Sequence, residues 1–147
     1  MKKKAIIVDL DGTLCNTKHR NHILETNPGN WDKFNEGIPF DIPNPWCMEI
    51  VENFAKEGYH ILFVTGRNSN THDATEQWLR TYLNPTVQWD LHMRPDHNYI
   101  ADTIIKTNIY FTKILPFYDV VFCVDDKRSI CDLWRSLGLV ALHCEDY

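Results

Sequence analysis

The sequence has no apolar segment long enough to cross a lipid bilayer, which argues against a membrane-spanning protein. Its five cysteines form no C-x-x-C pair, so neither a zinc site nor a dithiol redox motif is indicated. Because their number is odd and several lie in apolar runs, we expect reduced thiols in a cytoplasmic protein. Residues 1–4 resemble the start of a signal peptide, but the apolar stretch after them ends at Asp9 and is too short for a signal core.

Positive charge is also in deficit, with 15 basic against 20 acidic side chains and a formal net charge of -5. This balance argues against a protein that coats nucleic acid, because non-specific affinity comes mainly from neutralising phosphates. An enzyme with one local basic site remains compatible with it. No repeat, low-complexity tract or interdomain linker is visible, so residues 1–147 are expected to form a single domain with a substantial core.

Apolar residues cluster in short runs that are typical of strands. Three runs are mostly apolar, which is the pattern of parallel strands buried on both faces. A further segment alternates apolar and polar residues, as expected of a half-exposed edge strand. The buried strands are predicted at residues 5–8, 59–64 and 120–124, the edge strand at 87–93, and a last short strand at 139–142.

Between these runs the apolar residues follow a helical period. One helix is predicted to start with Asn44 as N-cap and Pro45 as first residue, and to stop at Gly58. The strand–helix alternation predicts an α/β fold, a Rossmann-like three-layer sandwich with a central parallel sheet of about five strands. Other helices are expected at residues 71–83, 98–115 and 127–137, and the apolar positions of the long one are Ile100, Ile104, Ile105, Phe111 and Leu115.

One segment does not fit the alternation. Residues 15–43 are polar, rich in Asn, Pro and His, and place Trp31 and Phe34 in a short helical turn. A connection of this length is uncommon unless it is functional. We interpret residues 15–43 as a flap, a small cap inserted after the first strand, over the carboxyl ends of the strands where such sheets bind their ligands.

Two acids directly follow the first predicted strand, in the motif Asp9-Leu10-Asp11-Gly12-Thr13. Side chains two residues apart on an extended backbone point the same way, so Asp9 and Asp11 are expected to converge. Two carboxylates this close repel each other, and a divalent cation relieves that repulsion. Oxygen ligands of this kind suit magnesium. The alternative is a solvated Asp-Gly turn.

A hydroxyl and an arginine close the second predicted strand, at Thr65-Gly66-Arg67. The Thr65 hydroxyl and the exposed backbone N–H groups, including that of Gly66, are suited to phosphate oxygens. Arg67 offers a bidentate contact to the same kind of group. Taken alone, the segment fits a polar loop equally well.

Two further signals come from the later strands. Lys106 follows Asp102 by one helical turn, a spacing that by itself favours a surface ion pair. Arg94 ends the predicted edge strand and taken alone is an ordinary terminal charge. Asp125 and Asp126 follow a buried strand, where adjacent acids are costly without a cation or other partners.

The four signals together favour catalysis, because all fall at one edge of one sheet. Acids for a cation, a hydroxyl and a lysine that offsets phosphate charge are what phosphoryl transfer requires. In this order the four motifs resemble those of the haloacid dehalogenase superfamily of aspartate-nucleophile phosphatases. The closer similarity is to the 3'-phosphatase domain of phage polynucleotide kinase/phosphatases, on Met93-Arg94, Asp102-x-x-x-Lys106, Val124-Asp125-Asp126, Leu133-Trp134-Arg135 and Gly138.

That similarity covers most of the chain and is weakest in the flap. The sequence contains no G-x-x-x-x-G-K-[ST] loop, so the kinase half of those enzymes is not expected here. The resemblance implies that Asp9 is the nucleophile and Asp11 the acid and base. It implies Mg²⁺ held by Asp9, Asp126 and the main-chain carbonyl of Asp11, with Asp125 orienting the site from behind these ligands.

The resemblance further implies that Thr65 and Lys106 bind the transferring phosphoryl group. Arg67 and Arg94, with Gly66, become candidates for holding the rest of the substrate. The flap residues His19 and Arg20 are further candidates, against the alternative that they are simply solvated.

The implied substrate is the 3'-phosphate end of a nucleic acid, because a short flap leaves the site open to a polymer. The alternatives are a nucleoside monophosphate or other small phosphate monoester, and a non-catalytic phospho-acceptor domain. The sequence gives no indication of oligomeric state.

Overall fold

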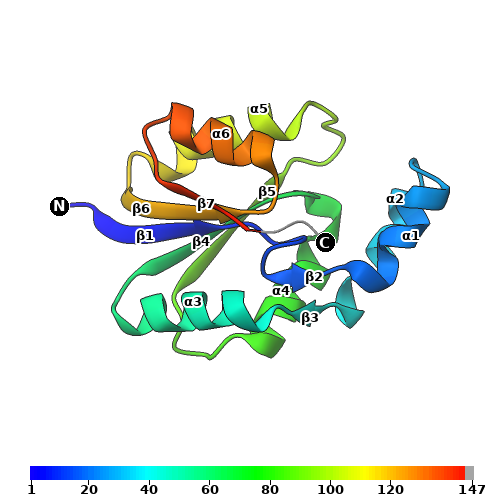
Figure 1. The fold of residues 1–147 in the computed structure, drawn as a ribbon, viewed down its shortest axis with the longest axis horizontal. Helices are drawn as coiled ribbons and strands as arrows, with labels where there is room; N and C mark the ends of the chain where they lie inside the picture. Colours follow the sequence, from blue (N-terminus) through cyan, green and yellow to red (C-terminus); the bar gives the residue numbers. More distant parts are fainter. Residues whose placement is uncertain (145–147) are drawn as a thin grey trace.

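A five-stranded parallel sheet forms the centre of the computed structural model, which describes residues 1–144. The strand order is β5-β4-β1-β6-β7, so the first strand of the chain lies in the middle (Figure 1). All five predicted strands are present. Their bounds are β1 (Lys3–Val8), β4 (His60–Asn68), β5 (Trp89–Arg94), β6 (Tyr118–Asp125) and β7 (Ala141–His143).

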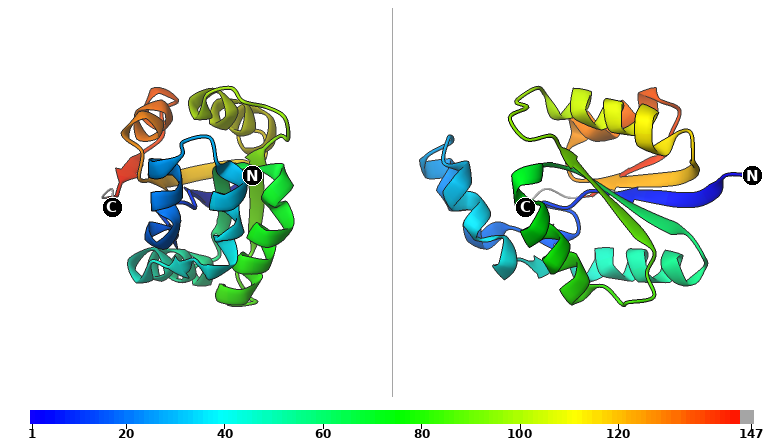
Figure 2. Two further views of the ribbon diagram at one scale, coloured as in Figure 1. Left: turned by 90° about the vertical axis from the view of Figure 1, so that its right-hand side faces the viewer. Right: turned by 180° about the vertical axis from the view of Figure 1, so that it is seen from behind.

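Helices cover both faces of this sheet, which confirms the predicted three-layer sandwich. Figures 1 and 2 show α3 and α4 on one face and α5 and α6 on the other. No helix within residues 1–144 is both long and apolar enough to span a membrane. The helices are α3 (Pro45–Lys56), α4 (His72–Tyr82) with a 3₁₀ turn η2 (Ser69–Thr71) before it, α5 (Asp102–Ile109), the π-helical η3 (Tyr110–Ile114) and α6 (Arg128–Ser136).

The central strand explains why the apolar runs have no polar face. Ala5 and Ile7 of β1 pack into the core under α5 and α6, whereas Ile6 and Val8 pack into the core under α3 and α4. Both faces of β1 are therefore dry, and its side chains after Lys4 are fully buried. This anchoring fixes the position of the residue that follows the strand, Asp9.

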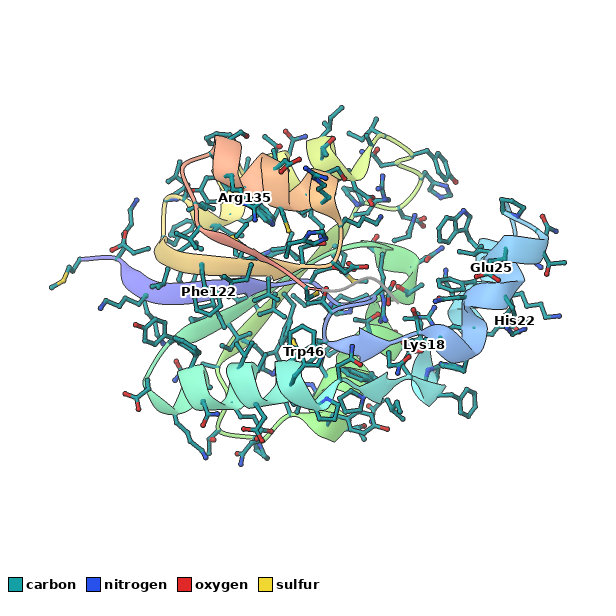
Figure 3. All side chains as sticks on the ribbon, viewed as in Figure 1. Lys18, His22, Glu25, Trp46, Phe122 and Arg135 are labelled. Atoms are coloured by element: carbon teal, nitrogen blue, oxygen red, sulfur yellow. The ribbon has the colours of Figure 1, made fainter. Side chains whose placement is uncertain are left out.

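The flap is a small subdomain at the carboxyl end of the sheet (Figure 2). Its base is a two-stranded antiparallel ribbon, and it contains two helices where the sequence indicated a single helical turn. Lys18, His22 and Glu25 mark the first helix, which projects beyond the sheet (Figure 3). The elements are β2 (Cys15–Asn16), α1 (Lys18–Thr26), α2 (Trp31–Glu36), the 3₁₀ turn η1 (Ile38–Phe40) and β3 (Ile42–Pro43).

The long helix predicted at residues 98–115 is wrong in two respects. It begins at Asp102, because the Asn98 side chain accepts a hydrogen bond from the Ile100 N–H and holds the preceding turn outside the helix. It also changes to a π-helix at Tyr110, which breaks the 3.6-residue phase of the apolar pattern. Of the apolar positions identified in the sequence only Ile105 is buried, and the buried face consists of Ile105, Ile109, Tyr110 and Ile114.

Candidate active site

Asp9 lies at the carboxyl end of the central strand and is buried. Its N–H donates to the Val124 carbonyl, which ties it to the neighbouring strand β6. The chain then turns sharply, and Gly12 adopts a φ of 79°. A side chain at Gly12 is also excluded by space, since its Cβ would lie 2.3 Å from Oδ2 of Asp126. The turn thus brings Asp9 and Asp126 to one place.

Lys106 forms the electrostatic centre of the site. Its Nζ donates to Oδ1 of Asp9 at 3.0 Å and to Oδ2 of Asp125 at 2.9 Å, and the side chain is only 3% exposed. Burial lowers the pKa of Lys106, but Asp9 and Asp125 raise it more, so the pKa is raised overall and the lysine is charged. The alternative of a surface ion pair with Asp102 is therefore wrong.

Three carboxylates converge beside this lysine. Ligand oxygens of Asp9, Asp125 and Asp126 all lie within 4.8 Å of one another. Burial raises the pKa of Asp9 well above its usual range, and repulsion from Asp125 adds to this, while Lys106 offsets part of it. The hydroxyl of Thr13 donates to Oδ2 of Asp9 at 3.3 Å and lies 3.5 Å from Oδ1 of Asp126. The donor set is the oxygen-rich, anionic kind that suits Mg²⁺.

The Asp11 carboxylate is held by two arginines. Oδ1 of Asp11 accepts hydrogen bonds from Nε of Arg67 at 3.0 Å and from Nη2 of Arg20 at 3.1 Å. Partial burial raises the pKa of Asp11, but Arg67 and then Arg20 lower it more, so the pKa is lowered overall. The Asp11 side chain is thus an ionised partner of two arginines, while its charge also acts on Asp9 and adds to the rise in the pKa of that carboxyl group.

The two arginines come from different parts of the fold and meet at a third acid, Asp41 of the flap. Nε and Nη2 of Arg20 each lie 2.8 Å from the Asp41 carboxylate, and Nη2 of Arg67 lies 3.2 Å from it. Nε2 of His19 lies 2.7 Å from the same carboxylate. Asp41 is fully buried. Arg20 is buried too, so the alternative that this flap residue is solvated is wrong for Arg20.

Exchanging Asp41 for asparagine is expected to destabilise the domain by about 1–3 kcal/mol, because buried arginine donors lose a charged acceptor. Activity is expected to fall about tenfold or more, because Arg20 and Arg67 then hold Asp11 less firmly. Urea unfolding and steady-state phosphatase assays measure the two effects. The control is Asp32→Asn in the same flap, where the acid is exposed and a change within about 0.5 kcal/mol is expected. Equal behaviour of both variants contradicts the role of Asp41.

The predicted substrate-binding residues near β4 are engaged with the protein itself. The Thr65 hydroxyl accepts a hydrogen bond from the Arg67 N–H at 3.1 Å. Arg94 donates through Nε to the Gly66 carbonyl at 3.1 Å and pairs with the Asp102 carboxylate. Its Nη1 donates to the carbonyls of residues 98 and 100, so Arg94 clamps the loop before α5 against β4.

Sequence reasoning missed three residues at or beside this site. Thr13 lies within the first motif, but nothing in the sequence indicated a role for its hydroxyl group. Asp41 lies in an irregular polar segment, where nothing distinguishes a buried acid from a solvated one. Lys127 follows Asp126 directly, and its Nζ lies 2.6 Å from Oδ2 of Asp102 while the side chain is 57% exposed.

Comparison with known proteins identifies the family of this chain. The family model of the polynucleotide kinase PNKP phosphatase domain matches residues 3–146. The chain belongs to this family. It is therefore a phosphatase domain of the haloacid dehalogenase superfamily and a phosphomonoesterase, as the four motifs indicated.

Individual relatives agree with the family. A protein of Autographa californica nuclear polyhedrosis virus, assigned as a bifunctional polynucleotide kinase/RNA ligase, is 25% identical over 98% of this chain. A chain in the Pnkp1/Rnl/Hen1 RNA repair complex is 30% identical over 99% of this chain, with a TM-score of 0.80. This PNKP phosphatase domain spans 20% of the viral protein and 43% of the chain in the complex.

A more distant structure shares the fold alone. The class C acid phosphatase from Bacillus anthracis, solved with tungstate bound, is 17% identical with a TM-score of 0.68. The alignment covers 99% of this chain and 68% of that enzyme. The Rossmann-like core is thus common to phosphatases with little sequence in common.

Proposed function

We propose that this PNKP phosphatase domain removes the 3'-phosphate from polynucleotide ends through an aspartyl-phosphate on Asp9, with Mg²⁺ as cofactor. The observation that carries the proposal is the buried ion pair between Lys106 and Asp9, placed among three carboxylates at the end of the central strand. Lys106 opposes the rise in the pKa of Asp9 that burial causes, and so favours the ionised carboxylate that nucleophilic attack requires.

In the first step a carboxylate oxygen of Asp9 attacks phosphorus, and the bond between phosphorus and the alcohol oxygen of the substrate breaks. Asp11 gives its proton to the departing alcohol. An entering phosphate dianion raises the pKa of a nearby carboxyl group, which offsets the lowering by Arg67 and Arg20 and returns Asp11 to its acid form. Lys106 offsets charge on the phosphoryl oxygens, and Thr65 contributes a hydroxyl and backbone N–H group.

In the second step water attacks the phosphorus of the aspartyl-phosphate, and the bond from phosphorus to the Asp9 oxygen breaks. The Asp11 carboxylate accepts a proton from that water, which restores its acid form for the next cycle. The two arginines favour the ionised state that this step requires, because they lower the pKa of Asp11. Inorganic phosphate is released and Asp9 is regenerated.

The residues present fit a divalent cation. Asp9 and Asp126, with the main-chain carbonyl of Asp11, are the proposed ligands, and Asp125 orients Lys106 and the turn behind them. When bound, Mg²⁺ supplies positive charge to the phosphoryl oxygens and relieves the repulsion among the carboxylates. In the protein alone, the raised pKa of Asp9 reflects burial first and that repulsion second.

The choice of a polymer end as substrate has two supports. The flap comprises only residues 15–43, and an insertion this short covers less of the site than a large cap domain does. The relatives include a viral polynucleotide kinase/RNA ligase and a component of an RNA repair complex. A nucleoside monophosphate or another small phosphate monoester is the second candidate, favoured by the net charge of -5, which repels a polyanion.

A comparison of substrates tests the choice. The kcat/KM for a 3'-phosphorylated oligonucleotide is expected to exceed that for the matching nucleoside 3'-monophosphate by about tenfold or more, since contacts to remote parts of a substrate lower the barrier. Activity on both is expected to vanish in EDTA and return with Mg²⁺. A preference for the monophosphate contradicts the polymer assignment, and full activity in EDTA contradicts the metal.

A further inference from the structure

Trp31 is an exposed aromatic residue on the flap. Its side chain lies on α2 three residues before Phe34, and residues at this spacing share one face of a helix. The two rings meet edge to face, with centroids 5.8 Å apart. Phe34 is buried, but Trp31 is 56% exposed. The same face of α2 therefore has one ring fixed inside the flap and one ring open to solvent.

That face is directed toward the catalytic acid. The guanidinium of Arg20 lies over the ring of Phe34, 4.1 Å from its centroid, and donates through Nη1 to the Phe34 carbonyl. The same guanidinium donates through Nη2 to Asp11. A continuous series of contacts thus leads from the flap to the site, through Trp31, Phe34, Arg20 and Asp11.

Filling the flap does not require the indole of Trp31. Phe34 and Ile38 already provide buried apolar side chains between the flap helices and the domain. An indole that remains more than half exposed gains little from folding compared with one that is fully buried. A large, rigid aromatic surface on the flap, which contacts Asp11 through Arg20, is suited to stacking on a nucleobase, and such stacking contributes about 1–3 kcal/mol per base.

We propose that Trp31 stacks on a nucleobase next to the scissile 3'-phosphate and so makes the site selective for nucleotides. The inference rests on the proposed function and names the part of the substrate that the flap binds. Because every base has a flat π face, the contact discriminates bases from base-free phosphates and tolerates any sequence.

The test uses two single-stranded oligonucleotides that differ only at the end, one with a base on its 3'-phosphorylated nucleotide and one abasic there. Trp31→Ala is expected to raise KM for the base-bearing end by about 5- to 150-fold, which is the stacking free energy converted to a ratio. The KM for the abasic end is expected to change less than about twofold. Trp31→Tyr is expected to retain most of the affinity, because it keeps a ring.

The outcomes separate stacking from support of the flap. An equal loss on both ends, expressed in kcat, overturns the inference and shows that Trp31 acts through Phe34 and Arg20. No loss on either end overturns it too. Phe117→Ala is the matched control, because this exposed ring precedes β6 at the opposite end of the sheet. If the unaltered domain fails to act on either 3'-phosphorylated oligonucleotide, the proposed function itself fails, irrespective of the variants.

Discussion

Turnover is expected to fall by about 10⁴-fold or more when Asp9 is replaced by asparagine, because an amide oxygen cannot form the covalent intermediate. The change is nearly isosteric, and Asp9 is fixed by the central strand and by its N–H bond to Val124, so the fold is expected to persist. Steady-state and single-turnover assays on a 3'-phosphorylated oligonucleotide measure the loss. Asp73→Asn, at an exposed acid of α4, is the control. Activity retained by Asp9→Asn refutes the nucleophile.

The stability of Asp9→Asn is expected to depend on pH differently from that of the unaltered domain. The folded-state pKa of Asp9 is raised, so in EDTA the folded domain retains a proton that the unfolded chain has released. Unfolding free energy therefore falls as pH rises from the unfolded carboxyl pKa to the folded one. Asp9→Asn removes this dependence and is expected to be the more stable form at neutral pH in EDTA. Thermal unfolding over a pH series measures it, and identical pH dependence in both proteins refutes it.

Replacing Lys106 with methionine is expected to destabilise the domain by about 3–5 kcal/mol, because Asp9 and Asp125 become buried acids without a cation. Activity is also expected to be lost, since the lysine offsets charge on the transferring group. Methionine nearly matches the volume of the lysine stem, so a cavity contributes little. Urea unfolding in EDTA gives the free energy of unfolding directly.

Two controls isolate the charge effect. Lys113→Met removes an exposed lysine from η3 and is expected to change stability by less than about 0.5 kcal/mol. Mg²⁺ is expected to restore part of the stability lost in Lys106→Met, because a cation among the carboxylates relieves the same repulsion. Acid is expected to narrow the deficit too, since the carboxyl group of Asp9, whose pKa is raised, takes up a proton and loses its charge. A deficit unaffected by either contradicts the electrostatic account.

The fold was predictable because its central strands are apolar throughout. The runs at residues 5–8 and 120–124 have no polar face, and only strands buried on both sides explain this. The long helix was less predictable, because its start depends on the turn that the Asn98 side chain and Arg94 hold outside the helix, and because its phase changes at a π-helical turn. The apolar period of the sequence carries no signal for either feature.

The candidate site divides in the same way. Asp9 follows from its position after a buried strand and Lys106 from the order of the four motifs, and their Oδ1 and Nζ atoms lie 3.0 Å apart in the structure. The partners of Asp11 do not follow, because Arg20 and Asp41 lie in a flap whose conformation has no periodic signal.

The shared ion pairs at the base of the flap limit how it can be engineered. Arg67 of the sheet bonds to Asp41 of the flap, and Arg20 of the flap bonds to Asp11 of the turn, so each part supplies half of the other's counter-charges. These ion pairs therefore hold the flap in a fixed position against the sheet. A flap transplanted from another phosphatase must therefore match Arg67 of the sheet and Asp11 of the turn with its own equivalents of Arg20 and Asp41. Extra residues can instead be inserted at the exposed tip near Gly29 with little loss of stability.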